Sequence, residues 1–143
     1  MSAVIFLDAG PLGLLSNPNQ TRKVVACRQW MAALLHAGRR VIVPEITDYE
    51  IRRELIRAGL VNSIPLLNTL ANQLEYLPLN TSAMRLAADL WAQARQQGQP
   101  TAGDNTIDGD VILAAQALSL GTPDVLIATN NVGHIERFVP AEV

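Results

Sequence analysis

Val4-Ile5-Phe6-Leu7-Asp8 is a short apolar run that ends in an aspartate. Unbroken apolar runs of this length are typical of strands that are buried on both faces of a sheet. Arg40–Val43 and Val125–Ala128 have the same character, and Leu74–Leu79 is a weaker fourth candidate. The first run therefore predicts a buried strand that carries a carboxylate at its carboxyl end.

Stretches with helical periodicity separate these runs, and most of them end just before a glycine. Glycine is common there because it readily adopts the left-handed conformation that closes a helix. The predicted helices are Thr21–Ala37, Ile46–Ala58, Ser63–Gln73, Asn80–Gln97 and Ile107–Leu120. Strands that alternate with helices imply right-handed crossovers and a parallel sheet. The predicted fold class is α/β, in a single domain over residues 1–143.

The composition is that of a well-packed globular chain. Apolar residues make up 49% of the 143 residues and charged residues only 17%. The net charge is −2 and there is no basic tail. This argues against a protein that coats nucleic acid electrostatically, although a local basic face remains possible.

The amino-terminal sequence and the cysteine count bear on the compartment. Cys27 is the only cysteine, so no disulfide can form within the chain, which fits a reducing compartment. The first fifteen residues lack a basic segment, and Asp8 interrupts their apolar run, so they resemble neither a signal peptide nor a membrane span. We expect a cytoplasmic protein that does not contact a membrane.

Acidic residues gather in one short segment. Asp104, Asp108 and Asp110 fall within seven positions with no Lys or Arg among them, in a predicted loop just before an apolar helix. Converging like charges repel, so this acidic cluster predicts raised pKa values or a bound cation. A favourable interaction with the helix dipole explains one such acid well and three poorly.

Four segments deliver oxygen atoms to one edge of the predicted sheet, because ligands in open α/β sheets bind at the carboxyl ends of the strands. Asp8 follows the first strand, and Glu50 and Glu54 lie on the helix after the second. The acidic cluster precedes the last strand, which runs into residues 129–131. Hard oxygen donors suit Mg²⁺ or Mn²⁺, whereas zinc prefers His and Cys.

Several stretches resemble the PIN domain of VapC-type toxin ribonucleases, in the family's order and spacing. They are residues 4–12, 44–55, 108–115 and 127–134, and the similarity extends over essentially the whole chain. The resemblance implies a three-layer α/β/α fold with a central parallel sheet of four to five strands and a Mg²⁺ or Mn²⁺ site. It also implies a homodimer, an RNA substrate and a small antitoxin that inserts a peptide into the acidic pocket.

The resemblance assigns roles to residues that match the family's motifs. The residues that match its catalytic positions are Asp8, Glu50, Asp110 and Asn131. The candidate metal ligands are Asp8, Asp110, Glu50 and Asp104. The accessory candidates are Asp104, Asp108, Glu54 and Thr129. Many relatives carry Asp in the last motif where this chain has amides and a histidine, so the second metal position stays open.

Each candidate also has a purely structural explanation. Asp8 can end the strand or cap the turn that follows it. Glu54 can pair with Arg57 or Arg53 on a solvated surface. Asn131 can serve as a turn former, for which Asn is common.

The leading functional hypothesis is a metal-dependent endoribonuclease, the toxin of a type II toxin–antitoxin pair, in which metal-activated water cleaves RNA. The alternative is a catalytically weak or inactive PIN-like module that binds RNA or protein. A phosphoacceptor domain or a phosphatase is disfavoured, because Ala9 and Gly10 follow Asp8 and the only lysine is Lys23. P-loop and dinucleotide-binding motifs are absent from the sequence.

Overall fold

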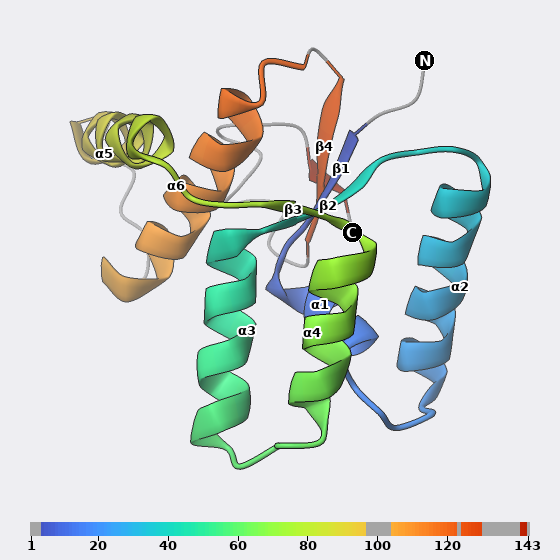
Figure 1. Ribbon diagram of the computed structural model, residues 1–143. Coiled ribbons are helices and arrows are strands. Elements are labelled where there is room, and N and C mark those ends of the chain that lie inside the picture. Colours follow the sequence, from blue (N-terminus) through green and yellow to red (C-terminus); the bar gives the residue numbers. More distant parts are fainter. Residues whose placement is uncertain (1–3, 97–103, 123, 130–140, 143) are drawn as a thin grey trace.

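The computed structural model describes residues 4–96, 104–122, 124–129 and 141–142, which form a parallel sheet between helices (Figure 1). The strands are β1 (Val4–Leu7), β2 (Val41–Pro44), β3 (Glu75–Leu77), β4 (Val125–Ala128) and β5 (Ala141–Glu142). They lie in the order β3-β2-β1-β4-β5, and every neighbouring pair is parallel. The predicted parallel α/β sheet is therefore confirmed, with the first apolar run as its central strand.

The helices agree closely with the predicted set, apart from the first. They are α1 (Ala9–Leu15), α2 (Arg22–His36), α3 (Glu45–Arg57), α4 (Ser63–Gln73), α5 (Thr81–Gln96) and α6 (Asp104–Ser119). Gly38 and Gly59 follow α2 and α3 with φ values of +77° and +70°, which confirms their predicted role in ending these helices.

Helix α1 was not predicted, because Gly10 and Pro11 suggested a turn. Pro11 lies in the first helical turn, where no backbone N–H has an intrahelical partner, so it costs no hydrogen bond. Leu12 and Leu15 are buried against the sheet and stabilise this short helix through packing.

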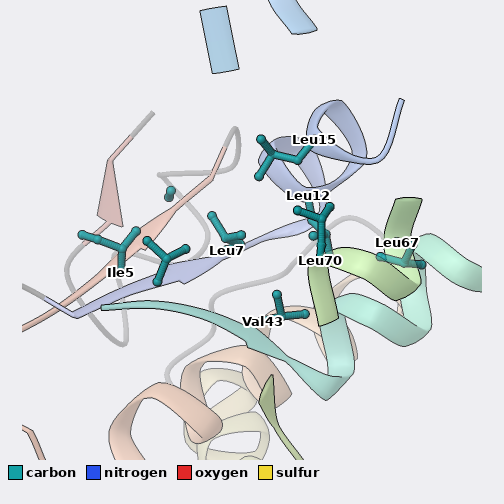
Figure 2. Close-up of a cluster of buried hydrophobic side chains, with 9 residues drawn as sticks. Ile5, Leu7, Leu12, Leu15, Val43, Leu67 and Leu70 are labelled. Atoms are coloured by element: carbon teal, nitrogen blue, oxygen red, sulfur yellow. The ribbon is translucent and has the colours of Figure 1, made fainter. Parts of the chain in front are cut away.

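Two apolar cores cover the two faces of the sheet. On one face, alternate residues of β1 and β2 pack against α1 and α4, with α2 at the periphery; Figure 2 shows Ile5, Leu7 and Val43 beside leucines of these helices. On the other face, Phe6 and Ile42 pack against α6, which is in turn covered by α5. The arrangement is therefore three-layered, with α5 and α6 on one side and α2 on the other (Figure 1).

The connections place the carboxyl end of β1 at a turning point of the sheet. The chain passes from β1 to β2 on one side, and it later pairs β4 with β1 on the other. Ligands in such sheets bind where the strand order reverses in this way. In the described ranges, no helix is long and apolar enough to cross a membrane.

Candidate functional site

Asp8 lies at the carboxyl end of β1 and caps α1. Its backbone N–H donates to the carbonyl oxygen of Ala128 at 3.0 Å, and its Oδ1 accepts from the backbone N–H of Ala9 at 2.7 Å. Asp8 is 6% exposed. The capping explanation is therefore confirmed as a contact, but each carboxylate oxygen can accept more than one bond. Capping and ligation are compatible at this residue.

Thr129 fixes the other oxygen of the same carboxylate. Its hydroxyl donates to Asp8 Oδ2 at 2.5 Å, and the residue is completely buried just after β4. The ends of β1 and β4 are thus joined through side chains as well as through the sheet. Thr129, an accessory candidate from the sequence, thus contacts Asp8 directly.

Glu50, on the second turn of α3, lies against the backbone of Gly109 on α6. A Cβ atom added at residue 109 would lie 2.4 Å from Glu50 Oε2 and 3.1 Å from its Cδ. Only glycine therefore leaves room for this carboxylate in its present position. Gly109 was passed over in the sequence, although a glycine inside a helix often marks a close approach of this kind.

The pKa of Glu50 depends on two other predicted site carboxylates, Asp8 and Asp110. Its pKa is raised to about 7, first by burial, then by the negative charge of Asp8 and, to a smaller extent, of Asp110, while Arg53 acts in the opposite direction. Asp110 is 8% exposed and lies on α6 directly after Gly109. The structure therefore brings Asp8, Glu50 and Asp110 close enough to influence one another.

These three side chains fit a hard divalent cation in their chemistry. All their donors are carboxylate oxygens, and the mutual repulsion that raises the pKa of Glu50 is what a bound cation relieves. As the side chains lie, no three acidic, histidine or cysteine groups within the described residues are close enough to coordinate one ion. Glu50 is the carboxylate of the three that borders a hollow, so its side chain has open space beside it.

The acidic cluster lies on a helix, which corrects the predicted loop. Helix α6 begins at Asp104 instead of Ile107. Successive helical residues point about 100° apart, so Asp108 is exposed while Asp110 is buried. Asp108 and Asp110 therefore point in different directions, and the charge of Asp110 acts on Glu50.

The other candidates are less central or lie outside the described residues. Glu54 is exposed and forms an ion pair with Arg57 at 2.7 Å, as its structural explanation predicted. The side chain of Asp104 is outside the described part of the chain, and so is Asn131 altogether.

Gln116 is a buried polar residue that was not singled out in the sequence. It is 1% exposed on α6. Its Oε1 accepts from the backbone N–H of Ile46 at 3.2 Å, and its Nε2 donates to the carbonyl oxygen of Leu77 at 2.9 Å. Helix α3 has no side-chain cap of its own, because Pro44 precedes it. Gln116 therefore satisfies the start of α3 and sets its position relative to α6.

A hollow of about 470 Å³ opens beside Glu50. It lies between α3 and α6. Its polar lining residues are Tyr49, Glu50, Arg53, Glu54 and Asp108. The site thus combines buried carboxylates with an accessible recess, as a hydrolytic centre requires.

Comparison with known proteins shows similarity at the level of structure. No protein-family model and no curated protein matches the chain. Solved structures do match. A chain of VapBC2 from Rickettsia felis, bound to a DNA fragment from its promoter, has a TM-score of 0.73 and 15% identity, with 97% of each chain covered.

Two further structures agree. A chain of DNA-bound VapBC from Salmonella typhimurium has a TM-score of 0.67 and 20% identity, with 98% of this chain and 97% of that chain covered. VapC20 from Mycobacterium tuberculosis, a toxin that cleaves the sarcin–ricin loop, has a TM-score of 0.63 and 16% identity, with 94% and 96% covered. These similarities confirm the predicted PIN-like fold.

Proposed function

We propose that this chain, which has the PIN-like fold of VapC structures, is a metal-dependent endoribonuclease. The observation that carries the proposal is that Asp8 and Asp110 lie close enough to the partly buried Glu50 to act on its charge; burial first, and then these two charges, raise the pKa of Glu50 to about 7. The negative charges of two neighbouring acids thus act on a third carboxylate that is itself partly buried. Such an arrangement is typical of catalytic and metal-binding centres.

In this proposal Asp8, Glu50 and Asp110 hold Mg²⁺ or Mn²⁺, and Asp104 is a further ligand. A cation held there acidifies a water molecule and neutralises charge on a phosphodiester. Thr129 and the backbone of Ala9 fix the two oxygens of Asp8, so this ligand is held in place before the ion binds.

Glu50 has a different part. Its place beside the hollow leaves the side chain free to shift, and its raised pKa means that it gives up a proton as a ligand near neutral pH. Asn131, which follows β4 in the sequence, is kept in the proposal as a further catalytic residue on the ground of its motif alone. The accessory roles of Asp108 and Glu54 are to supply negative charge at the mouth of the hollow, which both residues line.

We further propose that the chain acts as the toxin of a toxin–antitoxin pair. Several structures of similar fold are VapBC complexes, in which such a chain is found with a VapB protein. A cognate antitoxin would block the acidic recess, and the chain would form a homodimer in the cytoplasm. VapC20 is a toxin that cleaves the sarcin–ricin loop, which supports RNA as the substrate class.

Metal binding and RNA cleavage test the proposal together. Saturating Mn²⁺ should raise the free energy of unfolding by about 2.7 kcal/mol at a hundred times the dissociation constant. Asp8→Asn and Asp110→Asn should lose both this increase and cleavage of single-stranded RNA. Glu75→Gln is the matched control, because Glu75 is an exposed carboxylate paired with Arg40 on the edge strand β3.

The outcomes separate the proposal from its alternative. Stabilisation by Mn²⁺ that is equal in the wild type and in Asp8→Asn contradicts the metal site. RNA binding without cleavage in Mn²⁺ indicates instead a PIN-like binding module.

A further inference from the structure

Tyr49 is an exposed aromatic residue directly beside the candidate site. It precedes Glu50 on α3 and is 56% exposed. The guanidinium carbon of Arg53 lies 5.1 Å from the centre of the Tyr49 ring, one helical turn further along. The guanidinium thus lies over one face of the ring at the surface of α3, and we call the two groups the Tyr49–Arg53 platform.

Arg53 differs from the other arginines of α3 in its partners. Arg52 pairs with Asp48 at 3.0 Å and Arg57 pairs with Glu54 at 2.7 Å. Within the described residues, Arg53 forms no ion pair at such a distance, although its charge acts on Glu50. Its positive charge lies beside Glu50 and Glu54, on both of which it acts, without the close contact that ties Arg52 and Arg57 to one carboxylate each.

The Tyr49–Arg53 platform and Glu50 share one recess. Tyr49 and Arg53 line the hollow of about 470 Å³, together with Glu50 and Gly109. A group that rests on the ring is thereby brought next to Glu50. The negative surroundings disfavour a phosphate chain except where Arg53 offsets them, so the position of one nucleotide is favoured over its neighbours.

We propose that the Tyr49–Arg53 platform is the site at which an unpaired base of single-stranded RNA stacks, with Arg53 contacting the adjoining phosphate. Unstacked bases in single strands bind on aromatic rings and guanidinium planes, and this contact is independent of sequence to a large extent. A duplex cannot use it, because its bases are already stacked on one another. The inference rests on the proposed function in that the RNA is the substrate of the neighbouring carboxylates.

Binding measurements in a cleavage-deficient background test the inference. Asp8→Asn is a suitable background, since asparagine keeps an acceptor that caps α1. The dissociation constant of a short fluorescein-labelled single-stranded RNA is measured by anisotropy for this protein and for added Tyr49→Phe, Tyr49→Leu and Arg53→Gln. Circular dichroism establishes that each variant is folded.

An abasic scan makes the test specific for stacking. In the Asp8→Asn protein and with Tyr49→Phe, removing the base at one position should weaken binding by about 5- to 150-fold, the range for one base on an aromatic ring. When Tyr49→Leu is added to the Asp8→Asn protein, the intact RNA should bind about 5- to 150-fold more weakly. The same abasic substitution in the RNA should then have little further effect. A duplex of the same sequence should not distinguish Phe from Leu.

Arg53 is tested through salt dependence and through matched controls. Arg53→Gln should reduce the slope of log affinity against log salt by about 0.7, the value for one phosphate contact on a single strand. Arg57→Gln should leave the slope nearly unchanged, because that arginine is already paired. Trp30→Leu, at a partly exposed tryptophan of α2 outside the hollow, controls for the loss of a surface aromatic.

The outcomes distinguish a failure of the stacking site from a failure of the proposed nuclease activity. Equal RNA binding by Tyr49→Phe and Tyr49→Leu overturns the inference, and the ring then serves a protein contact or none; cleavage by the wild type in Mn²⁺ would still uphold the nuclease. A Tyr49-dependent abasic position without any cleavage by the wild type supports the stacking site and contradicts the nuclease.

Discussion

The carboxylate of Glu50 occupies the space that a side chain at Gly109 would need, since a Cβ atom there would lie 2.4 Å from Glu50 Oε2. Two helices that are distant in sequence meet at this point, and each depends on the identity of the other's residue. A larger side chain at position 109 would displace only the free end of the flexible Glu50 side chain. Such a change should therefore affect function more than stability.

Gly109→Ala should therefore abolish function without unfolding the protein. Alanine favours the helix by up to about 1 kcal/mol over glycine, and Glu50 can rotate away, so the free energy of unfolding should change by less than about 1 kcal/mol. RNA cleavage should fall at least about tenfold, because Glu50 leaves its place. Urea unfolding and a cleavage assay give the two readings.

A double variant supplies the control for this prediction. In a Glu50→Ala background, Gly109→Ala should simply stabilise α6, because nothing then occupies the space. Wild-type cleavage by Gly109→Ala would show that the position of Glu50 has no importance for activity.

Glu50→Gln should stabilise the metal-free protein, and only at high pH. The pKa of Glu50 is raised from 4.5 to about 7, so its contribution to stability is fully present below pH 4.5 and is lost as the pH rises through 7. Because the group is partly exposed, solvent screening reduces the expected gain to about 1–2 kcal/mol at pH 8. Urea unfolding in EDTA at pH 5 and pH 8 measures it.

The corresponding substitution at a surface carboxylate, Glu75→Gln, should change stability in the opposite direction. Arg40 holds the pKa of Glu75 below its usual value through a hydrogen bond, so Glu75→Gln should slightly destabilise the protein at pH 8 and have no effect in acid. A Glu50→Gln protein whose stability tracks the wild type at both pH values would contradict the repulsion among the three carboxylates.

Thr129→Val should weaken metal binding. Valine keeps the shape of the side chain and removes the hydroxyl that donates to Asp8 Oδ2. Loss of a hydrogen bond that orients a ligand typically costs about 10- to 100-fold in metal affinity. The concentration of free Mn²⁺ in titrations, read from its electron paramagnetic resonance signal, gives the dissociation constant. Thr129→Ser, which keeps a hydroxyl, should bind nearly as the wild type does; equal losses in both variants would argue for packing instead.

Gln116→Leu should destabilise the protein by about 2–4 kcal/mol, since the N–H of Ile46 and the carbonyl of Leu77 then lose their partner in a buried place. Chemical denaturation at neutral pH measures the loss. Gln93→Leu, at an exposed position of α5, should change stability very little. A loss below about 0.5 kcal/mol in Gln116→Leu would mean that α3 does not need this side chain.

Local pattern was sufficient to predict most of the sheet and the long helices. The run at residues 4–7 is buried on both faces, and such a strand has no polar alternation to obscure it. The end of that run at Asp8, together with the rule that parallel strands present their carboxyl ends at one edge, brought Asp8 and Glu50 into the same predicted site.

The features that the sequence did not predict depend on tertiary contacts. Helix α1 contains Gly10 and Pro11 and is stable because Leu12 and Leu15 reach the core, which no local propensity expresses. Strand β5 has two residues, too few for any period. The start of α6 lies at Asp104, three residues before the predicted Ile107, and within this helix Asp108 is exposed whereas Asp110 is buried.

Gln116 shows the same limit at the site. A lone glutamine on an apolar helix has no periodic signal, and its partners lie 70 and 39 residues away in the chain. Contacts between residues this far apart in the chain become visible only in the folded molecule.

The position of β1 between β2 and β4 has a consequence for synthesis of the chain. A growing polypeptide makes Asp8 first and Glu50 soon after, but Asp110 and the strand that pairs with β1 through Ile5↔Leu126 come last. Until β4 has left the ribosome, Asp8 lacks both the hydroxyl of Thr129 and the neighbouring strand. A nascent chain that ends before β4 therefore lacks the contacts that hold Asp8 in place, so the three carboxylates are assembled only late in synthesis.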